Sequence, residues 1–181
     1  MEEKRLMRQQ VFSGKIIDVY SDTVQLPNGK EASREVVEHG GAVAVLAVDQ
    51  QQQVILVKQY RYPIQQLSLE VPAGKLERGE DPLESAKREL KEETGFEAKV
   101  WKPIFRYYTS PGFANEVIYL YLATELTYTG QCPDEDEFVE VESCSLEQAW
   151  TKIQAGEIED GKTIQAILWG KLQLSMMNSI I

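Results

Sequence analysis

Two neighbouring apolar runs constrain the fold of this chain more than any other feature. Residues 42–48 are apolar without interruption, and residues 54–57 resume the pattern after a short polar turn. Apolar runs of strand length with no polar alternation are typical of strands buried on both faces, because neither side is left for water. We therefore expect a central sheet that is covered by further structure on both sides.

Capping signals predict helices on either side of this sheet. Asp81 precedes Pro82, an arrangement typical of a helix start, and Gly95 stands where a helix C-terminus favours glycine. Ser145 opens a capping-box pattern with Gly156 as the stop signal. A last amphipathic helix is marked by four apolar residues, Ile164, Ile167, Leu168 and Leu172.

Further strands are indicated at the N-terminus and between the first two helices. Residues 11–20 are apolar and β-branched at many positions. Residues 23–26 and 33–38 flank a turn signal at 27–30, so we expect a small antiparallel element. Residues 104–108 and 117–122 alternate or run apolar, as strands do. The expected fold class is therefore mixed α/β: a sandwich with a mixed sheet, plus a small N-terminal antiparallel β element.

The charge balance and the histidine count exclude several functions. The chain has 29 acidic against 19 basic residues, a formal net charge of −10, and a single histidine, His39. Such an excess of negative charge repels nucleic acid and anionic membranes, so we expect neither as a partner. One histidine rules out multi-histidine metal sites, and the G-x-S-x-G motif of serine hydrolases is absent. A triad built on His39 stays formally possible, but we expect the acid–base chemistry of an enzyme to rest on carboxylates.

The sequence also bears on the compartment. No apolar run reaches the roughly 18 residues of a membrane span, and no apolar segment follows the charged N-terminus as in a signal peptide. Cys132 and Cys144 form no C-x-x-C pair, which fits a reducing environment. We expect a cytoplasmic protein.

The helix that starts after Asp81 carries an unusual acidic face. At 100° per residue, Leu83, Ala86 and Leu90 share an apolar face, and Glu89, Glu92 and Glu93 share the neighbouring one. Glutamates three and four apart repel by roughly 0.2–0.5 kcal/mol per pair. The pattern fits either a solvated acidic face or a site for a hard cation such as Mg²⁺. A P-loop is excluded, because Glu80 and Asp81 occupy the positions of its Lys and Ser or Thr.

This segment resembles the signature of the Nudix hydrolases, G-x5-E-x7-R-E-U-x-E-E-x-G-U. All nine fixed positions match: Gly74, Glu80, Arg88, Glu89, Leu90, Glu92, Glu93, Gly95 and Phe96. A chance match has odds on the order of one in a million. The surrounding order of strands and helices also resembles the Nudix αβα sandwich.

The resemblance implies a metal-dependent hydrolase of nucleoside diphosphate derivatives that uses Mg²⁺ or Mn²⁺. By this resemblance, Glu89, Glu93 and the carbonyl of Ala73 ligate metal, and Glu92 ligates it or supports a ligand. Arg88 would orient the glutamates and Glu80 would brace the preceding loop. Cations are physically needed because a diphosphate resists attack until its oxygens are neutralised.

Other positions resemble the ADP-ribose pyrophosphatase subfamily. Pro111 follows Gly95 by sixteen residues, within Ser110, Pro111 and Gly112, although Pro-Gly alone also makes ordinary turns. The N-terminal element, Arg34 with Glu35, and Arg61 fit the same subfamily. The resemblance implies cleavage of ADP-ribose to AMP and ribose 5-phosphate. It assigns Arg34 and Arg61 to phosphate or adenine, Glu116 to the terminal ribose, and, more weakly, Glu35 and His39 to the substrate.

The resemblance also implies a homodimer in which residues 1–39 are exchanged and residues 40–181 form the hydrolase domain. The exchanged element would contribute to the partner's site. The general base is expected in the acidic run 134–137, with Glu135 as base and Glu137 assisting a metal, although four adjacent acids also suit a solvated loop.

Two other functional classes stay open. One is a Nudix enzyme for another substrate: a nucleotide sugar, NADH or a dinucleoside polyphosphate. The other is a module that binds ADP-ribose without turnover, although such a sensor has no need of stacked, repelling glutamates.

Overall fold

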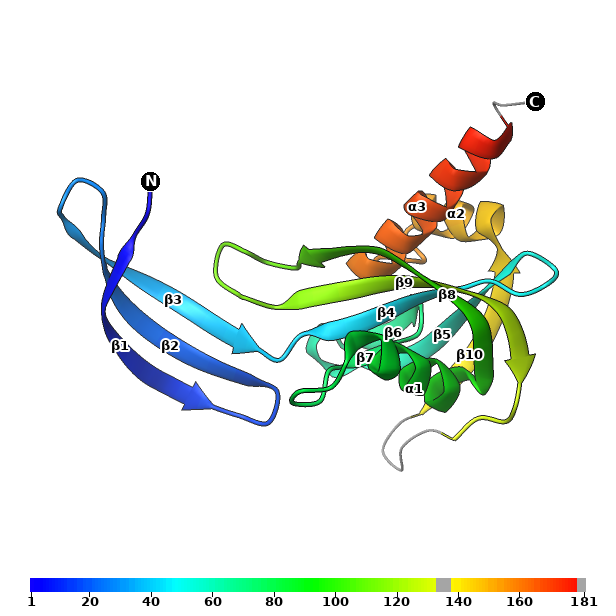
Figure 1. Cartoon of the computed structure of the whole chain (residues 1–181), viewed down its shortest axis with the longest axis horizontal. Helices are drawn as coiled ribbons and strands as arrows, with labels where there is room; N and C mark the ends of the chain where they lie inside the picture. Colours follow the sequence, from blue (N-terminus) through cyan, green and yellow to red (C-terminus); the bar gives the residue numbers. More distant parts are fainter. Residues whose placement is uncertain (133–137, 179–181) are drawn as a thin grey trace.

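The computed structural model describes residues 1–132 and 138–178 and confirms the predicted mixed α/β fold (Figure 1). A three-stranded antiparallel sheet comprises β1 (Lys4–Ser13), β2 (Ile17–Gln25) and β3 (Glu31–His39). A mixed four-stranded sheet has the order β7 (Ala73–Lys75), β4 (Ala42–Ala47), β9 (Val117–Tyr128), β8 (Phe96–Tyr108). A third sheet has the order β10 (Val139–Ser145), β5 (Gln53–Arg61), β6 (Gln66–Glu70). The helices are η1 (Tyr62–Ile64), α1 (Pro82–Thr94), α2 (Leu146–Gln154) and α3 (Gly161–Asn178).

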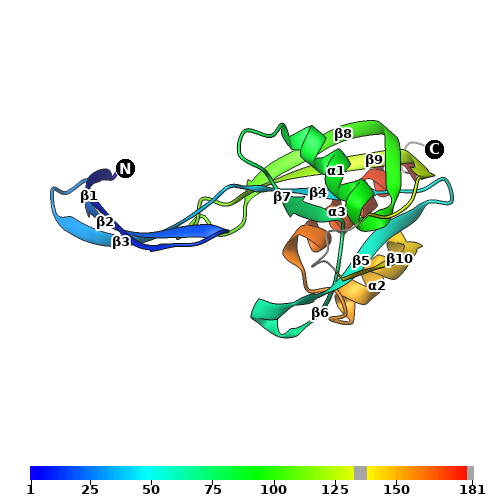
Figure 2. The same ribbon diagram turned by 90° about the horizontal axis from the view of Figure 1, so that it is seen from below.

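Strand β4 is buried on both faces, as its apolar run predicts. Val43 and Val45 pack with Ala86 and Leu90 of α1 in one cluster. Leu46, from the other face of the strand, belongs to a second cluster that includes Ala166 and Ile167 of α3. Figure 2 shows α1 on one side of the sheets and α2 with α3 on the other. Each fully buried Val or Leu side chain contributes about 1.5–3 kcal/mol, so these two layers hold α1 and α3 against the sheet.

Sheet β1–β2–β3 forms an arm that projects from one side of the molecule (Figures 1 and 2). Its contact with the rest runs through Val37, whose N–H donates to the Phe113 carbonyl at 2.7 Å and whose carbonyl accepts from Asn115 N–H at 3.1 Å. Residues 11–20 are not one continuous strand, because the chain turns between Ser13 and Ile17. The first strand instead begins at Lys4, in a charged stretch without an apolar pattern.

Both capped helices begin where the sequence predicts. The Asp81 side chain accepts from the N–H groups of Leu83 and Glu84, and Gly95 ends α1 with a φ of 74°. The Ser145 capping box is present at α2. The predicted apolar face of α3 is partly wrong: Ile167 is buried, but Leu168 is 40% and Leu172 57% exposed. Among the described residues, no helix combines the length and apolarity needed to cross a membrane.

A buried ionic cluster ties β5, β6 and α3 together. The Glu70 carboxylate is 2% exposed and accepts from Arg61 Nε at 2.8 Å and Nη2 at 2.7 Å, and it also pairs with the Lys162 ammonium. Asp160 accepts from the Thr163 N–H at 2.9 Å, and the Thr163 hydroxyl accepts from Val71 N–H at 2.8 Å. These bonds fasten the start of α3 to the end of β6.

The cluster predicts an acid-sensitive contribution to stability. Burial opposes ionisation of Glu70, but the hydrogen bonds from Arg61 and the Lys162 charge outweigh it and lower the pKa from 4.5 to about 2. The ionised carboxylate therefore stabilises the fold fully above pH 4.5, and this contribution, on the order of 3 kcal/mol, is lost as the pH falls toward 2. The difference in unfolding free energy between wild type and Glu70→Gln, measured in urea, should be large at pH 7 and smaller at pH 3. A difference that stays constant over this range contradicts the argument, and Glu142→Gln, at an exposed ion pair, serves as the control.

Candidate active site

The site begins where the acidic face of α1 meets strand β7. Because Ala86 and Leu90 pack against β4, the neighbouring helix face turns toward β7, and Glu89 and Glu93 are only 8% and 2% exposed. The solvated-face interpretation is therefore wrong for these two glutamates. Burying two carboxylates without compensation is costly, so their partners decide what the site can do.

Gly74 allows Glu89 to reach the backbone of β7. A Cβ atom added to Gly74 would lie 1.9 Å from the Glu89 carboxyl carbon, so any other side chain here would force this carboxylate to move. Beside it, the Glu93 Oε2 atom accepts the backbone N–H of Ala73 at 2.9 Å. The two carboxylates thus lie directly against consecutive residues of one short strand.

Arg88 connects three carboxylates around this face. Its Nη1 lies 2.9 Å from Glu89 and 2.8 Å from Glu92, and its Nε lies 3.2 Å from Glu80. Burial alone would lower the pKa of Arg88, but these carboxylates raise it above its ordinary value. The hydrogen bond from Arg88 in turn lowers the pKa of Glu80. Glu80 also accepts the Glu77 N–H at 3.0 Å, which closes the loop before α1.

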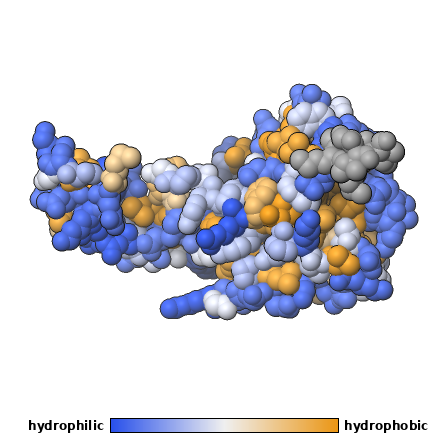
Figure 3. Space-filling model, turned by 45° about the horizontal axis from the view of Figure 1, so that its top comes forward, coloured by the Kyte–Doolittle hydropathy of each residue, from blue (hydrophilic) through white to orange (hydrophobic). Residues whose placement is uncertain are grey.

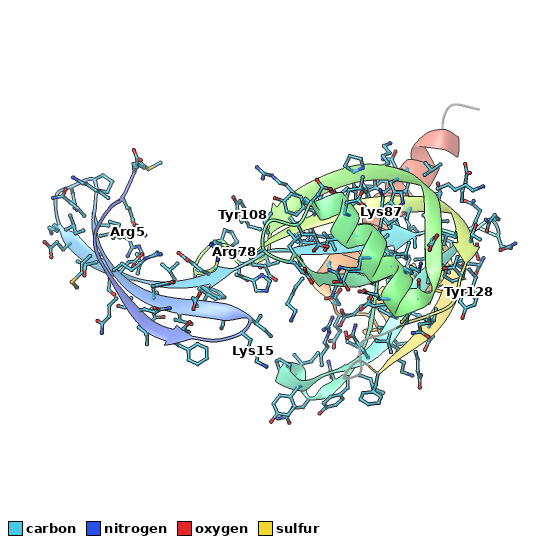
Figure 4. The ribbon with its side chains drawn as sticks, turned by 60° about the horizontal axis from the view of Figure 1, so that its bottom comes forward. Arg5, Lys15, Arg78, Lys87, Tyr108 and Tyr128 are labelled. Carbon is cyan, nitrogen blue, oxygen red and sulfur yellow. The ribbon has the colours of Figure 1, made fainter. Side chains whose placement is uncertain are left out.

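A cleft of about 720 Å³ opens over these residues. Its lining includes the backbone of residues 73–76, the carboxylates Glu77, Glu89, Glu92 and Glu116, and the cations Lys15, Arg61, Lys75, Arg88 and Lys162. Lys15 comes from the turn between β1 and β2, at the end of the arm nearest the rest of the molecule (Figure 4). Lys87, on the same helix as Glu89, lies on the outer face of α1 instead (Figure 4). A mixture of acids and cations suits an anionic ligand bound together with a metal ion.

The residues at β7 fit a hard divalent cation that keeps part of its water shell. Within residues 1–132 and 138–178, no three Asp, Glu, His or Cys side chains converge as a complete metal site. Glu89, Glu93 and the Ala73 carbonyl are oxygen donors gathered on one strand and one helix face. Mg²⁺ commonly takes one or two carboxylates and completes its octahedron with water and substrate phosphates. The donor set therefore suits such an ion better than zinc, which favours N and S ligands.

The structure brings some of the sequence-predicted residues into one place and leaves others outside it. Ala73, Arg88, Glu89, Glu92, Arg61 and Glu116 all line the cleft, with Glu93 behind them. Arg34 and Glu35 lie on β3. The Arg34 Nε atom donates to the carboxylate of Glu3, the residue just before β1, at 2.9 Å. Neither Arg34 nor Glu35 lines the cleft of its own chain. Glu135 and Glu137 lie outside the described residues.

Ser110, Pro111 and Gly112 lie in the loop between β8 and β9, which contacts the arm through Val37. Glu116 closes this loop by accepting from the Thr109 hydroxyl at 2.7 Å. The His39 Nδ1 atom accepts the Gly41 N–H at 3.0 Å and lies 3.5 Å from Glu116. Since an accepting Nδ1 carries no proton, we treat the contact with Glu116 as a close approach and not as an ion pair. His39 thus supports the junction between arm and cleft.

Sequence reasoning missed Lys15, Lys162 and Glu70. Lys15 follows Gly14 in a turn, a position with no chemical signature. Lys162 does carry a signal, because a lysine in the first turn of a helix opposes the helix dipole. Glu70 is separated from Lys162 by 92 residues, so no local pattern reports their pairing.

Comparisons with known proteins agree with this geometry. Residues 38–167 match the NUDIX domain family, and residues 3–37 match the nucleoside diphosphate sugar hydrolase N-terminal domain. The chain is 49% identical to an ADP-ribose pyrophosphatase of Bacillus subtilis, over 96% of this chain and 95% of that protein. It is 44% identical to a methanol dehydrogenase activator of Bacillus methanolicus, over 95% and 94% of the two chains. A crystal structure of an ADP compounds hydrolase superposes with a TM-score of 0.86 at 21% identity, covering 98% of this chain and 96% of that one. At this identity the superposition shows the fold alone.

The close approach at Gly74 predicts the effect of a single methyl group. Gly74→Ala should displace the Glu89 carboxylate and weaken divalent-cation binding about ten-fold or more, as changes beside a metal ligand commonly do. Titration with Mn²⁺, followed by water proton relaxation, measures this affinity. Gly40→Ala is the matched control, because its Cβ would lie at an ordinary 3.6 Å from the Leu76 carbonyl oxygen. Equal affinities in the two variants would show that the Gly74 contact does not shape the cation site.

Proposed function

This chain belongs to the Nudix hydrolase family, and we propose that it hydrolyses the diphosphate bond of ADP-ribose to AMP and ribose 5-phosphate. The observation that carries this proposal is the 49% identity, over nearly the whole of both chains, to an ADP-ribose pyrophosphatase. The cleft supports it, because carboxylates and cations meet there as an anionic diphosphate with a bound metal requires.

Enzymes of this family typically depend on a divalent metal, and we assign Mg²⁺ or Mn²⁺ to Glu89, Glu93 and the Ala73 carbonyl. The ion, when bound, neutralises phosphate oxygens and lowers the pKa of a bound water. Glu92 would complete or support the ligand set. Arg88 would keep these carboxylates oriented when the cleft is empty, because a bidentate guanidinium holds carboxylates in a fixed direction.

The remaining cleft residues are assigned by charge. Arg61 would bind a phosphate of the substrate, since a guanidinium matches phosphate geometry. Glu116 would accept hydrogen bonds from ribose hydroxyls, and the loop of Ser110, Pro111 and Gly112 would enclose that end of the substrate. The bond between Val37 and the loop supports this role, because it keeps the loop beside the arm.

We assign the general base to Glu135, with Glu137 assisting a metal. The support lies in the segment just before them. The Cys132 N–H donates to the Glu92 carbonyl at 3.3 Å, and the Gln131 side chain donates to the Glu93 carbonyl at 2.7 Å. Cys132, the last described residue before the acidic run, therefore lies beside the C-terminal end of the helix that carries the metal-binding glutamates.

We further propose a homodimer in which residues 1–39 serve the partner's cleft. Arg34 and Glu35 do not line the cleft of their own chain, although the resemblance assigns them to the substrate. The arm also exposes large apolar side chains: Leu6, Met7, Val11, Phe12 and Ile16 are 46–64% exposed. Figure 3 shows apolar patches along the arm between hydrophilic atoms. Such a surface is costly in a monomer, and pairing of two chains would cover it.

We propose a cytoplasmic location for the protein. The free thiols of Cys132 and Cys144 accord with it, because a reducing compartment keeps cysteines unpaired.

Activation of a methanol dehydrogenase is a second candidate, favoured by the 44% identity to such an activator. It differs from the first in requiring a partner enzyme. Adding the chain to a purified methanol dehydrogenase, with and without ADP-ribose as competitor, measures this activity directly.

A substrate panel tests the main proposal. With Mg²⁺ and equal concentrations, ADP-ribose should be cleaved at least about ten-fold more efficiently than GDP-mannose, NADH or a dinucleoside polyphosphate. Chelation of the metal should abolish turnover. Reaction in ¹⁸O-labelled water, with analysis of both phosphate products, identifies the attacked phosphorus. A faster reaction with another compound would refute the choice of substrate, and binding without any turnover would favour the sensor.

The same assay ranks the two candidate acids of the run 134–137. Glu135→Gln should lower kcat about 100-fold or more, as loss of a general base does. Glu137→Gln should instead raise the Mg²⁺ concentration needed for half-maximal rate. The reverse pattern would exchange the two assignments.

Subunit mixing tests the exchanged arm. Light scattering should give twice the monomer mass of 20.6 kDa. Arg34→Ala and Glu93→Gln should each be nearly inactive alone, but a heterodimer of the two has one site with both residues intact. Random reassociation should restore about a quarter of the wild-type activity. Recovery would be absent if Arg34 served its own chain, and a monomeric mass would contradict the dimer itself.

A further inference from the structure

We propose that Lys162, at the start of α3, is a substrate-binding cation for the diphosphate, and that Glu70 positions it beside Arg61. The inference rests on the proposed function, because it adds a residue to the same cleft. No position in the family signature includes Lys162, and its role is argued from its place and its contacts.

Lys162 stands where two cavities meet. It lines the cleft over β7 together with Arg61. Both residues also line an adjoining cavity of about 580 Å³ between the β5–β6 hairpin and the start of α3. A ligand that extends from the metal-binding carboxylates toward this second cavity therefore passes both cations.

The ammonium group is held in place before any ligand binds. Its side chain is only 11% exposed, and it pairs with Glu70 and, at 3.0 Å, with Asp160. Glu70 also holds Arg61 through two hydrogen bonds of 2.8 and 2.7 Å. Two long cationic side chains that would otherwise be flexible are thus fixed by one buried carboxylate. Such pre-organisation lowers the entropic cost of binding.

The two cations of the cluster, Arg61 and Lys162, face two carboxylates, Glu70 and Asp160, and Lys162 still keeps a hydrogen-bond donor. One carboxylate, Glu70, serves two cations. Asp160 is shared with the start of α3, since it also accepts from the Thr163 N–H at 2.9 Å and the Thr163 hydroxyl at 2.6 Å. Two of the three ammonium hydrogens of Lys162 have partners among the described residues, which leaves a donor for a phosphate oxygen.

The position of Lys162 argues against a purely structural role. Asp160 already supplies the acid that accepts from the first turn of α3, whereas a cation at the next-but-one position opposes the helix dipole. Departures from such local rules are expected at functional sites, where another gain compensates. A purely structural tie between α3 and β6 predicts an effect on stability alone.

The test compares two lysines of the same helix. Lys162→Gln removes the cleft cation, and Lys171→Gln removes a lysine that pairs with Glu147 at 2.8 Å and does not line the cleft. With ADP-ribose and saturating Mg²⁺, Lys162→Gln should raise KM about ten-fold while kcat changes less than about two-fold, because the charge binds ground and transition state alike. The inhibition constant of ADP should rise in parallel. Lys162→Arg should restore most of the affinity, and Lys171→Gln should match wild type.

The comparison of Lys162→Gln with Lys171→Gln can overturn the proposed role of Lys162. A KM for Lys162→Gln equal to that of Lys171→Gln, whatever the change in Tm, would overturn the inference. If the wild type prefers another diphosphate, the proposed substrate fails, and the same comparison with that compound still tests Lys162. Should Lys162→Gln not fold, wild type with ¹³C-labelled lysine side chains is titrated with ADP. The Lys162 signal, assigned from its absence in Lys162→Arg, should then shift, and an unmoved signal would refute the role.

Discussion

The approach of the Glu89 carboxylate to Gly74 is the contact on which the rest of the site depends. It requires a helix and a strand to pack so closely that a single methyl group would overlap the carboxyl carbon at 1.9 Å. That closeness follows from the small and apolar face of α1, where Ala86 and Leu90 sit on β4. The same packing buries Glu93 against the Ala73 N–H. The positions of the carboxylates therefore follow from the fold itself, because the hydrophobic layer beneath the acidic face determines where they lie.

Buried charge in this protein is organised around shared partners. Arg88 serves three carboxylates, whereas Glu70 serves two cations. The first arrangement leaves negative charge over for a metal. In the second, Lys162 also pairs with Asp160, so the charges balance, and one donor of its ammonium group stays available for an anion. Both arrangements are stable because hydrogen bonds offset the desolvation that burial imposes. A protein with a net charge of −10 can thus present individual cationic donors to a phosphorylated ligand without changing its overall charge.

The parts of the fold that follow from local rules could be predicted from the sequence. The limits of α1 come from Asp81 and Gly95, and the double burial of β4 comes from its uninterrupted apolar run. Strands that form only because they pair with a neighbouring strand could not be predicted. Strand β7 has three residues and exists only through its pairing with β4, and the charged strand β1 is set by its register with β2. The glutamates of the site were found because a helix brings residues three and four apart together. Glu70 and Lys162 are 92 residues apart in the sequence, so no local sequence pattern indicates that they pair.

The proposed exchange of the arm gives a physical reason why the site of a single chain would be incomplete. Its sheet is held to the rest mainly by Val37 and the loop after β8, so little apolar area supports it from its own chain. A three-stranded sheet needs a covered hydrophobic face to be stable on its own, yet this one exposes Leu6, Val11 and Phe12. Arg34 pairs with Glu3 in a solvent-exposed contact and donates to the Ser33 carbonyl beside it, so it gains little from its position unless another surface approaches it. The turn that carries Lys15 already reaches the cleft of the same chain, so one arm can border two clefts. Folding, pairing and substrate binding would then depend on one another, because the surface that stabilises the arm is also the surface that completes the site.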